Sequence, residues 1–130
     1  MAADDNRAVV RRFIDEVFNN GNLSVAEEVL SPDYVHHDPA TGETGSGVDG
    51  LEQMVNYYRK AFPDFKVTVE DQIATEDRVV DDSIISFTIT RDGFLPFPIG
   101  QKIEMRLAHI FEMRGGKISK EIAFEMPRPV

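Results

Sequence analysis

Residues 102–126 read KIEMRLAHIFEMRGGKISKEIAFEM, a stretch that predicts two long β-strands joined by a tight turn. Alternate residues across 103–113 are apolar, and His109 is the only ionisable side chain in that row. After the turn at Gly115-Gly116, a second strand carries Glu121. An imidazole facing a carboxylate inside an apolar surface is the arrangement that proton-transfer chemistry on a small organic molecule requires.

The length of the turn decides whether these two groups meet. A three-residue loop over 114–116 pairs His109 with Glu121 and places Glu125 on the same face. A two-residue turn slips the register by one and places Ile122 opposite His109 instead. We favour the three-residue loop because it gives the second strand an apolar face of its own, made of Ile122, Phe124 and Met126. His109 is then either a proton-transfer group or a hydrogen-bonded core residue.

Composition limits the classes of function. The chain has 130 residues, of which 42% are hydrophobic and 28% charged, so we expect one globular domain over 1–130. The formal charge of -9 argues against nucleic acid and anionic lipid as partners, because phosphates attract basic surfaces. The lack of cysteine excludes disulfides and thiolate chemistry and fits a reducing compartment, so a cytoplasmic protein is expected. No stretch reaches the ~20 apolar residues of a membrane span, and no membrane partner is expected.

Helical periodicity fills the first half of the chain, and a period of two begins at Phe65. The expected elements before Phe65 are a helix ending at Asn20-Gly21, a helix over 25–30 that stops before Pro32, a short strand over 34–37, a glycine-rich loop over 38–50 and a helix ending near Phe62-Pro63. Antiparallel strands follow, interrupted at 92–100 by an apolar loop that holds two prolines. Helices followed by antiparallel strands predict an α+β fold.

Several local strings, spread over nearly the whole chain, resemble the SnoaL-like polyketide cyclases, a branch of the superfamily that includes nuclear transport factor two and ketosteroid isomerase. The strings are Tyr34-Val35-His36-His37-Asp38-Pro39, Gly47-Val48-Asp49-Gly50-Leu51, Ala61-Phe62-Pro63-Asp64-Phe65, Val69-Glu70-Asp71-Gln72-Ile73-Ala74, Asp77-Arg78-Val79-Val80 and Gly116-Lys117-Ile118. The resemblance implies three N-terminal helices in the concavity of a cone-shaped, strongly curved antiparallel or mixed sheet, with a pocket between them.

The resemblance also implies chemistry without a cofactor or a metal. Members of this family typically close a polyketide ring by intramolecular aldol condensation. A carboxylate removes a proton from a carbon acidified by flanking carbonyls, and hydrogen-bond donors stabilise the enolate. The expected substrate is therefore a small apolar or aromatic carbonyl compound.

The sequence departs from the family at one important position. Where the family usually has an aspartate after a tryptophan in the last strand, this chain has Ile122 followed by Ala123. We therefore expect Glu121 to act as the catalytic base, with Glu125 as the alternative and His109 as the proton partner or enolate donor. A one-residue bulge would present either acid differently.

Eight further residues are expected to line the substrate pocket: His37, Phe13, Tyr58, Phe62, Phe87, Phe94, Phe97 and Leu107. Phe94 and Phe97 lie on the apolar loop and are candidates for a lid. The resemblance favours His37 over His36, and holding the loop at 38–50 is the alternative role of His37. The alternative role of the aromatic residues is packing in the hydrophobic core.

Charged residues on the strands are expected to be solvated. The acidic residues Asp71, Glu76, Asp77, Asp81 and Asp82 are assigned to an exposed turn, and Arg91 and Arg106 to exposed strand positions.

Three functional hypotheses remain open besides cyclisation. The first is a non-catalytic binding module for a small apolar ligand, the second a hydroxylation partner in an antibiotic pathway, as some relatives are. The third is epoxide hydrolysis, which the superfamily performs with aspartates bracketing an arginine, here compared with Arg106 and Glu104. The resemblance implies a homodimer through the sheet, since proteins of this fold often dimerise there, and the exposed face made of Ile110, Ile122 and Phe124 would suit that use.

Overall fold

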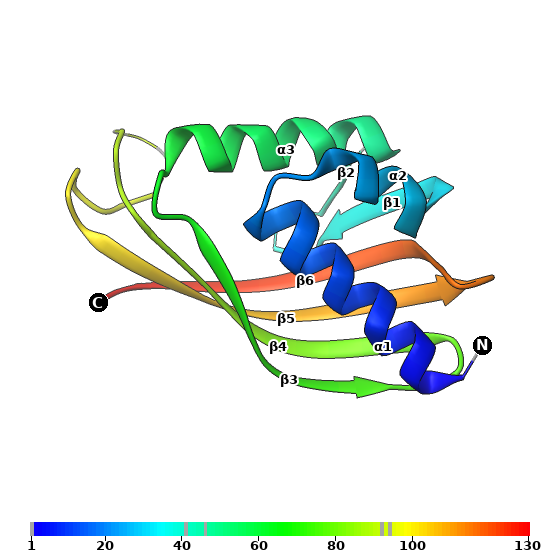
Figure 1. Cartoon of the computed structure of the whole chain (residues 1–130). Coiled ribbons are helices and arrows are strands. Elements are labelled where there is room, and N and C mark those ends of the chain that lie inside the picture. Colours follow the sequence, from blue (N-terminus) through cyan, green and yellow to red (C-terminus); the bar gives the residue numbers. More distant parts are fainter. Residues whose placement is uncertain (1, 41, 46, 92, 94) are drawn as a thin grey trace.

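The computed structural model describes residues 2–40, 42–45, 47–91, 93 and 95–130. Three helical segments are followed by two strands, a further helix and four more strands, and the six strands form one sheet, which confirms the predicted α+β class (Figure 1). The elements are α1 (Ala3–Arg12), the π-helix η1 (Phe13–Asn19), α2 (Leu23–Val29), β1 (Leu30–Asp38), β2 (Glu43–Gly45), α3 (Gly47–Ala61), β3 (Lys66–Ala74), β4 (Arg78–Thr88), β5 (Lys102–Arg114) and β6 (Lys117–Pro129). None of the described helices is both long and apolar enough to cross a membrane.

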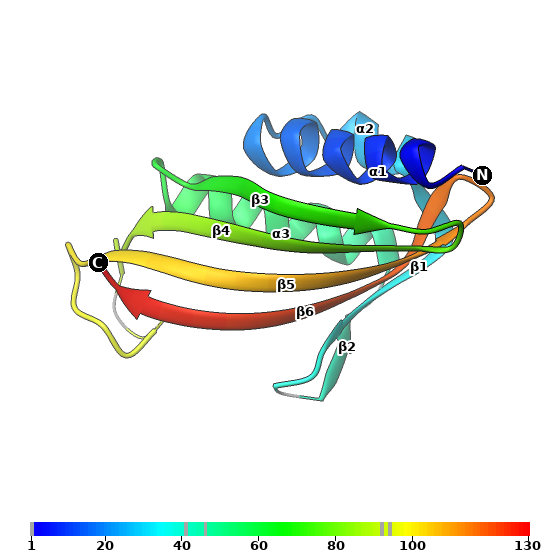
Figure 2. The ribbon, with the colours of Figure 1, turned by 90° about the horizontal axis from the view of Figure 1, so that it is seen from below.

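The sheet is mixed and strongly curved, as expected. Its strand order is β2-β1-β6-β5-β4-β3, in which β1 runs parallel to β6 and all other neighbours are antiparallel. The helices cover the concave face, and Figure 2 shows the other face of β3 to β6 turned toward the viewer with α3 behind it. The inner face therefore supplies the core, and any internal site lies between the sheet and the helices.

The first helical segment changes its winding midway. α1 continues directly into η1, whose residues Phe13 and Phe18 are buried. Arg59 on α3 holds the end of η1, because its Nη1 donates to the backbone oxygens of Phe18 at 3.0 Å and Asn19 at 2.5 Å. A π-helix is uncommon and is often found near functional sites. Here it turns two aromatic rings toward the sheet.

Two predicted boundaries were wrong. β1 starts at Leu30 and includes Pro32, so it is much longer than the strand expected at 34–37. The proline is tolerated because the parallel pairing with β6 is irregular between Leu30 and Val35. The expected loop at 38–50 contains β2 and the first residues of α3.

The outer face of the sheet carries an apolar row. Ile73 pairs with Val80, Val80 with Ile110, and Ile110 with Ile122, so the row crosses four strands. Phe124 and Met126 extend it and are 45% and 71% exposed. We call these six residues the outer apolar row.

Candidate active site

The β5–β6 hairpin brings His109 and Glu121 to the same inner face, but not through the predicted register. Arg114 pairs with Lys117 across a two-residue turn, in which Gly115 and Gly116 have φ angles of 61° and 77°. Positive φ at both positions is the geometry that glycine allows and that matches the twist of a hairpin. The predicted three-residue loop is therefore wrong.

A β-bulge at Ser119 restores the inward direction of Glu121. Met113 pairs with Ile118 and Glu112 with Lys120, so Ser119 is the extra residue. His109 consequently pairs with Ala123 rather than with Glu121 or Ile122. Glu121 lies diagonally from His109 on the same face, and Glu125 follows on that face opposite Leu107.

Asp81 on β4 is buried beside His109, which corrects its assignment to a solvated turn. It pairs directly with His109 in the sheet, and it is 2% exposed. Its Oδ1 lies 2.7 Å from Nδ1 of His109, and the hydroxyl of Ser83 donates to the same oxygen at 3.2 Å. Asp81 Oδ2 is buried without a hydrogen-bond partner among the described residues.

This carboxylate fixes how His109 is oriented and charged. An ionised Asp81 accepts from Nδ1–H, so the second ring nitrogen, Nε2, points toward Glu121. Burial alone lowers the pKa of His109, but the hydrogen bond with Asp81 and the charge of Glu121 act in the opposite direction, and together they raise it. The imidazole thus retains its proton to a higher pH than a free histidine does.

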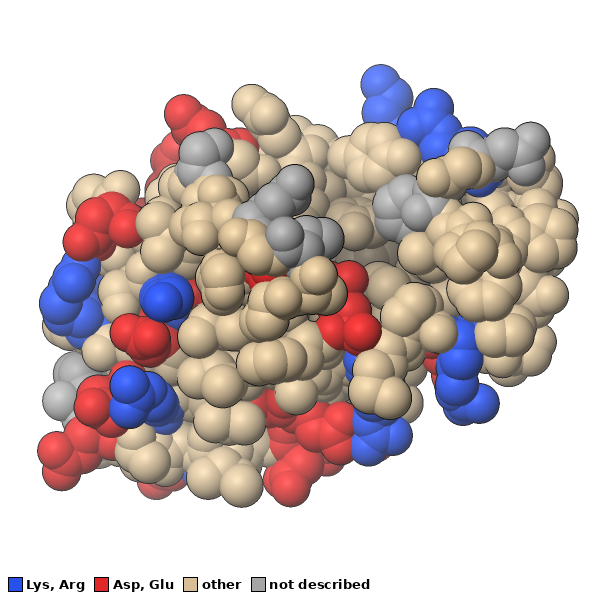
Figure 3. Space-filling view, turned by 180° about the vertical axis from the view of Figure 1, so that it is seen from behind, with Lys and Arg blue, Asp and Glu red and all other residues tan. Residues whose placement is uncertain are grey.

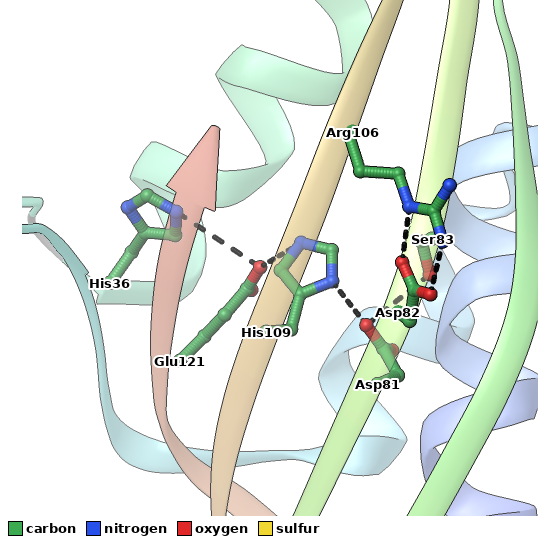
Figure 4. A network of polar contacts seen from close by, with 7 residues as sticks. All are labelled: His36, Asp81, Asp82, Ser83, Arg106, His109 and Glu121. Carbon is green, nitrogen blue, oxygen red and sulfur yellow. Dashed lines mark hydrogen bonds and ion pairs between the residues drawn. The ribbon is translucent and has the colours of Figure 1, made fainter. Parts of the chain in front are cut away.

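The buried Glu121 has three donor groups around it, of which Figure 4 shows those of His109 and His36. The hydroxyl of Tyr34 donates to its Oε1 at 2.7 Å, and Nε2 of His109 lies 3.5 Å from its Oε2. The Nε2 of His36 lies 4.0 Å from the same Oε2. Burial, and then the charge of Glu121, raise the pKa of Tyr34 well above its usual value, so this phenol remains a donor. Asp81, His109 and Glu121 form a buried line, which we call the inner triad.

His36, rather than His37, faces the site. Tyr34 and His36 lie on the same face of β1, and Tyr34 is fully buried. His37 points the other way, where its Nδ1 lies 3.2 Å from the Thr44 hydroxyl on β2. His37 does not line the internal space next to the inner triad, and its contact with Thr44 agrees with the alternative role of holding the 38–50 segment.

A small internal space adjoins the inner triad, and we call it the inner cavity. Its volume is about 30 Å³, enough for one or two water-sized groups. Its lining residues are Phe18, His36, Met54, Tyr58, Phe65, Ile85, Met105, Leu107, His109, Glu121, Ala123 and Glu125. Five residues predicted for the site therefore meet here: His109, Glu121, Glu125, Tyr58 and Leu107.

Two larger recesses lie beyond the inner cavity, on the other side of His36 and Met54. A recess of about 380 Å³ is lined by His36, Asp38, Thr44, Gly45 and Met54. A second recess of about 200 Å³ lies between these residues and the start of α3. His36 and Met54 line both recesses as well as the inner cavity, so they stand between the two regions. We call the two recesses the outer hollow; Figure 3 shows a hollow in the rear face of the molecule with acidic atoms at its margin.

Other predicted pocket residues lie elsewhere. Phe62 and Phe87 are fully buried core residues in mutual contact at 4.5 Å between ring centroids, and they do not line the inner cavity. Phe13 lines a separate cavity of about 20 Å³ that shares His109 and Glu121 with the first. Phe97 packs partly buried against the core, and Phe94 is outside the described residues.

The mouth of the inner cavity carries Glu125 and Tyr58. Burial, and then the nearby charge of Asp38, raise the pKa of Glu125. Burial also raises the pKa of Tyr58 to about 12, with Glu125 as the next cause. Tyr58 stacks on Phe65 with 5.4 Å between ring centroids. Among the described residues, no group of three or more histidine or acidic side chains is arranged to hold a metal ion.

Arg106 lies outside this site. It forms a two-point ion pair with Asp82 on the outer face of the sheet, and both side chains are exposed. The epoxide hydrolase comparison, which needs the arginine in the pocket, is therefore wrong.

The sequence held a signal for two of the missed residues. Asp81 continues the period-two row of Val79, Ser83 and Ile85, so alternation alone places it inward. His36 follows Tyr34 by two positions, and a large aromatic residue indicates the inner face. The contact between Tyr34 and Glu121 spans 87 positions and has no local signal.

Comparisons with known proteins agree with this architecture. The family model for the SnoaL-like polyketide cyclases matches residues 8–125. Among solved structures, IdmH of Streptomyces antibioticus, named "a putative polyketide cyclase", is 24% identical with a TM-score of 0.78, covering 92% of this chain and 91% of its own. AclR of Streptomyces galilaeus, named "a putative hydroxylase", is 23% identical with a TM-score of 0.80, and the match covers 98% of this chain and 83% of AclR. A "putative SnoaL-like polyketide cyclase" of Jannaschia sp. CCS1 is 22% identical with a TM-score of 0.79, and the match covers 95% of this chain and 86% of the Jannaschia protein. No curated protein matches the chain.

Proposed function

We propose that this chain, which belongs to the SnoaL-like polyketide cyclase family, catalyses proton transfer on a small carbonyl compound by acid–base chemistry in its inner cavity. The observation that carries the proposal is the inner triad, a histidine held between two buried acids with one nitrogen toward an internal space. Titratable groups with shifted pKa values in a cavity are typical of acid–base sites.

Each member of the triad has a distinct role. Asp81 is a positioning residue, because it fixes the ring of His109 and does not line the cavity. Glu121 is the base, since its carboxylate lines the cavity and the Tyr34 hydroxyl fixes its direction. His109 is the donor, and its raised pKa favours the doubly protonated ring, in which Nε2 carries a proton.

The reaction follows from these roles. Glu121 takes a proton from a carbon next to a carbonyl, and the electron pair of the broken C–H bond moves onto the carbonyl oxygen. His109 Nε2–H donates a hydrogen bond to that oxygen as its negative charge develops. In an aldol closure, the enolate carbon then bonds to a second carbonyl carbon of the same molecule, and the resulting alkoxide takes up the proton held by Glu121.

The sizes of the two spaces restrict how a substrate is bound. The inner cavity, at about 30 Å³, admits only the reacting atoms. The remainder of a substrate would occupy the outer hollow, whose larger recess of about 380 Å³ falls within the size range of ligand sites. Movement of His36 and Met54 would join the two spaces.

Glu121→Gln tests this proposal. The probe is ethyl benzoylacetate in D2O, and the measurement is the protein-dependent exchange of its C2 protons by NMR. Because general base catalysis contributes about 10²–10⁴-fold, we expect the exchange rate to fall by at least about 100-fold. Glu112→Gln, the same change on the outer face of β5, should leave the rate unchanged.

Two results would overturn the assignment of Glu121. One is an unchanged exchange rate in Glu121→Gln with the fold intact. The other is loss of exchange in Glu125→Gln alone, which would transfer the role of base to Glu125.

Ala123 favours one second candidate, a non-catalytic binding module. It occupies the position of the family aspartate and faces His109 across the strand pair. If the chain binds without turnover, a bound ligand should be recovered intact, and the wild type should not accelerate exchange. Ala123→Asp should then introduce exchange activity, because it adds a carboxylate opposite His109.

The assembly proposed with this function is a homodimer through the outer apolar row. Two copies that meet through this row would cover exposed side chains such as Phe124 and Met126. The surrounding ion pairs of Arg106 with Asp82 and Arg128 with Glu104 would form the polar rim that such interfaces have.

A further inference from the structure

The charges around the inner cavity are unevenly distributed. Its ionisable lining residues are two histidines, His36 and His109, and two acids, Glu121 and Glu125. Asp38 adds a third acid in the outer hollow. In the described part of the chain, neither space has a lysine or an arginine in its lining.

The inner triad has an excess of negative charge. With both acids ionised, one protonated His109 leaves the triad at a net charge of -1. Transfer of the proton to Glu121 leaves this net charge unchanged and moves one negative charge from Glu121 onto the substrate, in a low-dielectric interior where charge interactions are strong. A positive charge on the substrate would offset the negative charge in both states.

Glu125 is available to hold such a charge. It is exposed at the mouth of the cavity, and no described residue forms a hydrogen bond or an ion pair with it. It lies two residues beyond Ala123 on the inner face of β6, opposite Leu107. Burial and then Asp38 raise its pKa, and the nearby His36 and His109 offset this only in part, so a further cation beside Glu125 would favour its ionised form.

Tyr58 supplies the second part of a cation site. It lines the same cavity as Glu125, and its ring is held in an aromatic cluster with Phe65, Phe62 and Tyr57. An aromatic face attracts ammonium groups through its quadrupole, most strongly where water is partly excluded. A carboxylate and an aromatic ring at one opening form a recognition site for an ammonium group.

From this geometry we infer that the substrate carries a protonated amine, which Glu125 and the ring of Tyr58 bind at the mouth while the carbonyl end reaches His109 and Glu121. Asp38 adds long-range attraction from the outer hollow. Carboxylates and phosphates of similar size are repelled. This inference rests on the proposed function, because it names the class of substrate that the proposed reaction would take.

Binding of three probes of nearly equal shape tests the inference without turnover. The probes are benzylammonium, benzyl alcohol and benzoate, titrated into the wild-type protein at pH 7 and low ionic strength, with Kd values from NMR shifts. We expect benzylammonium to bind about three- to tenfold tighter than benzyl alcohol, and benzoate to bind most weakly. The preference should decrease as salt is added.

Two variants separate a local effect from the overall charge. Glu125→Gln should reduce the preference for benzylammonium over benzyl alcohol to less than about twofold, and Asp38→Asn should reduce it partly. Glu112→Gln changes the net charge equally but lies on the outer face, so it should retain the preference. Circular dichroism checks that each variant is folded.

The inference is overturned if benzoate binds as tightly as benzylammonium, if none of the three probes binds at millimolar concentration, or if Glu125→Gln keeps the preference. Any of these results leaves the exchange assay on Glu121→Gln unaffected. Conversely, an ammonium preference without proton exchange would refute the proposed catalysis while identifying the ligand class of the binding module.

Discussion

Replacing Asp81 by asparagine removes the charge that orients His109 while preserving the shape of the side chain. Both residues are buried, with exposures of 2% and 7%, and their polar atoms are 2.7 Å apart. Opposite charges at about 4 Å attract by about 4 kcal/mol at an effective dielectric constant of about 20. Asparagine keeps an oxygen acceptor, so a neutral hydrogen bond of about 1 kcal/mol remains. We therefore expect Asp81→Asn to lower the free energy of unfolding by about 2–3 kcal/mol at pH 6.

The effect should depend on pH in a definite direction. The folded-state pKa of His109 is raised above its ordinary 6.5, so its contribution to stability is fully present below pH 6.5 and is lost as the pH rises through the folded-state pKa. In Asp81→Asn the pKa of His109 falls, because burial still lowers it and the hydrogen bond to a carboxylate no longer raises it. The stability difference between wild type and variant is thus greatest at low pH and narrows as the pH rises.

Urea unfolding from pH 6 to pH 9 measures this difference, and NMR titration of the His109 ring follows its protonation directly. Asp82→Asn is the matched control, since Asp82 is the next residue on β4 and forms an exposed ion pair with Arg106. The control should change stability much less than Asp81→Asn does. A stability difference for Asp81→Asn that does not vary with pH, or an unchanged titration of His109, would refute the coupling described here.

Two further predictions concern the outer face and the π-helix. Phe124→Asp should convert the proposed dimer into a monomer, as measured by light scattering. The control is Ile99→Asp, at an isoleucine that is 58% exposed and lies outside the outer apolar row, and it should leave the dimer intact. Dissociation of both variants, or of neither, would count against the sheet interface. Gly21→Ala and Gly115→Ala both place alanine at positive φ, at 70° and 61°, but only at Gly21 would the new Cβ approach the Arg59 side chain, at 2.7 Å. Both variants should lose about 1 kcal/mol of stability from placing alanine at positive φ, and Gly21→Ala should lose more than Gly115→Ala in thermal unfolding. Equal losses in the two variants would show that the contact of Arg59 with η1 contributes nothing.

Local pattern was enough to predict the faces of the strands but not their pairing. The alternation around His109 correctly placed His109 on the inner face, but Glu121 shares that face only because a bulge compensates for a turn shorter than the one predicted. The exact register depended on an extra residue at Ser119, whose hydroxyl donates to the Glu112 backbone oxygen at 3.0 Å, and no local pattern indicates that bulge. A pair of glycines did favour the two-residue turn that the structure has.

The buried charges of the site were harder to predict for a different reason. Asp81 lies in a run of acidic residues, and such a composition is typical of solvated turns. Its burial is stabilised by His109, which approaches only when β4 and β5 pair, so the compensating group is 28 positions away. Tyr34 and His36 reach Glu121 through the parallel pairing of β1 with β6, which also depends on contacts between distant segments.

The unpaired Ser119 also determines how this family member can change by insertion and deletion. Loss of that single codon would reverse the orientation of every later side chain in β6, so that Glu121 and Glu125 would face solvent while Ile122 and Phe124 would face the helices. The sequence would keep all its acidic residues and its apolar ones, yet the chemistry and the self-association surface would exchange sides. A relative that has glutamates at the positions of Glu121 and Glu125 therefore has a comparable site only if it also retains the extra residue at the position of Ser119.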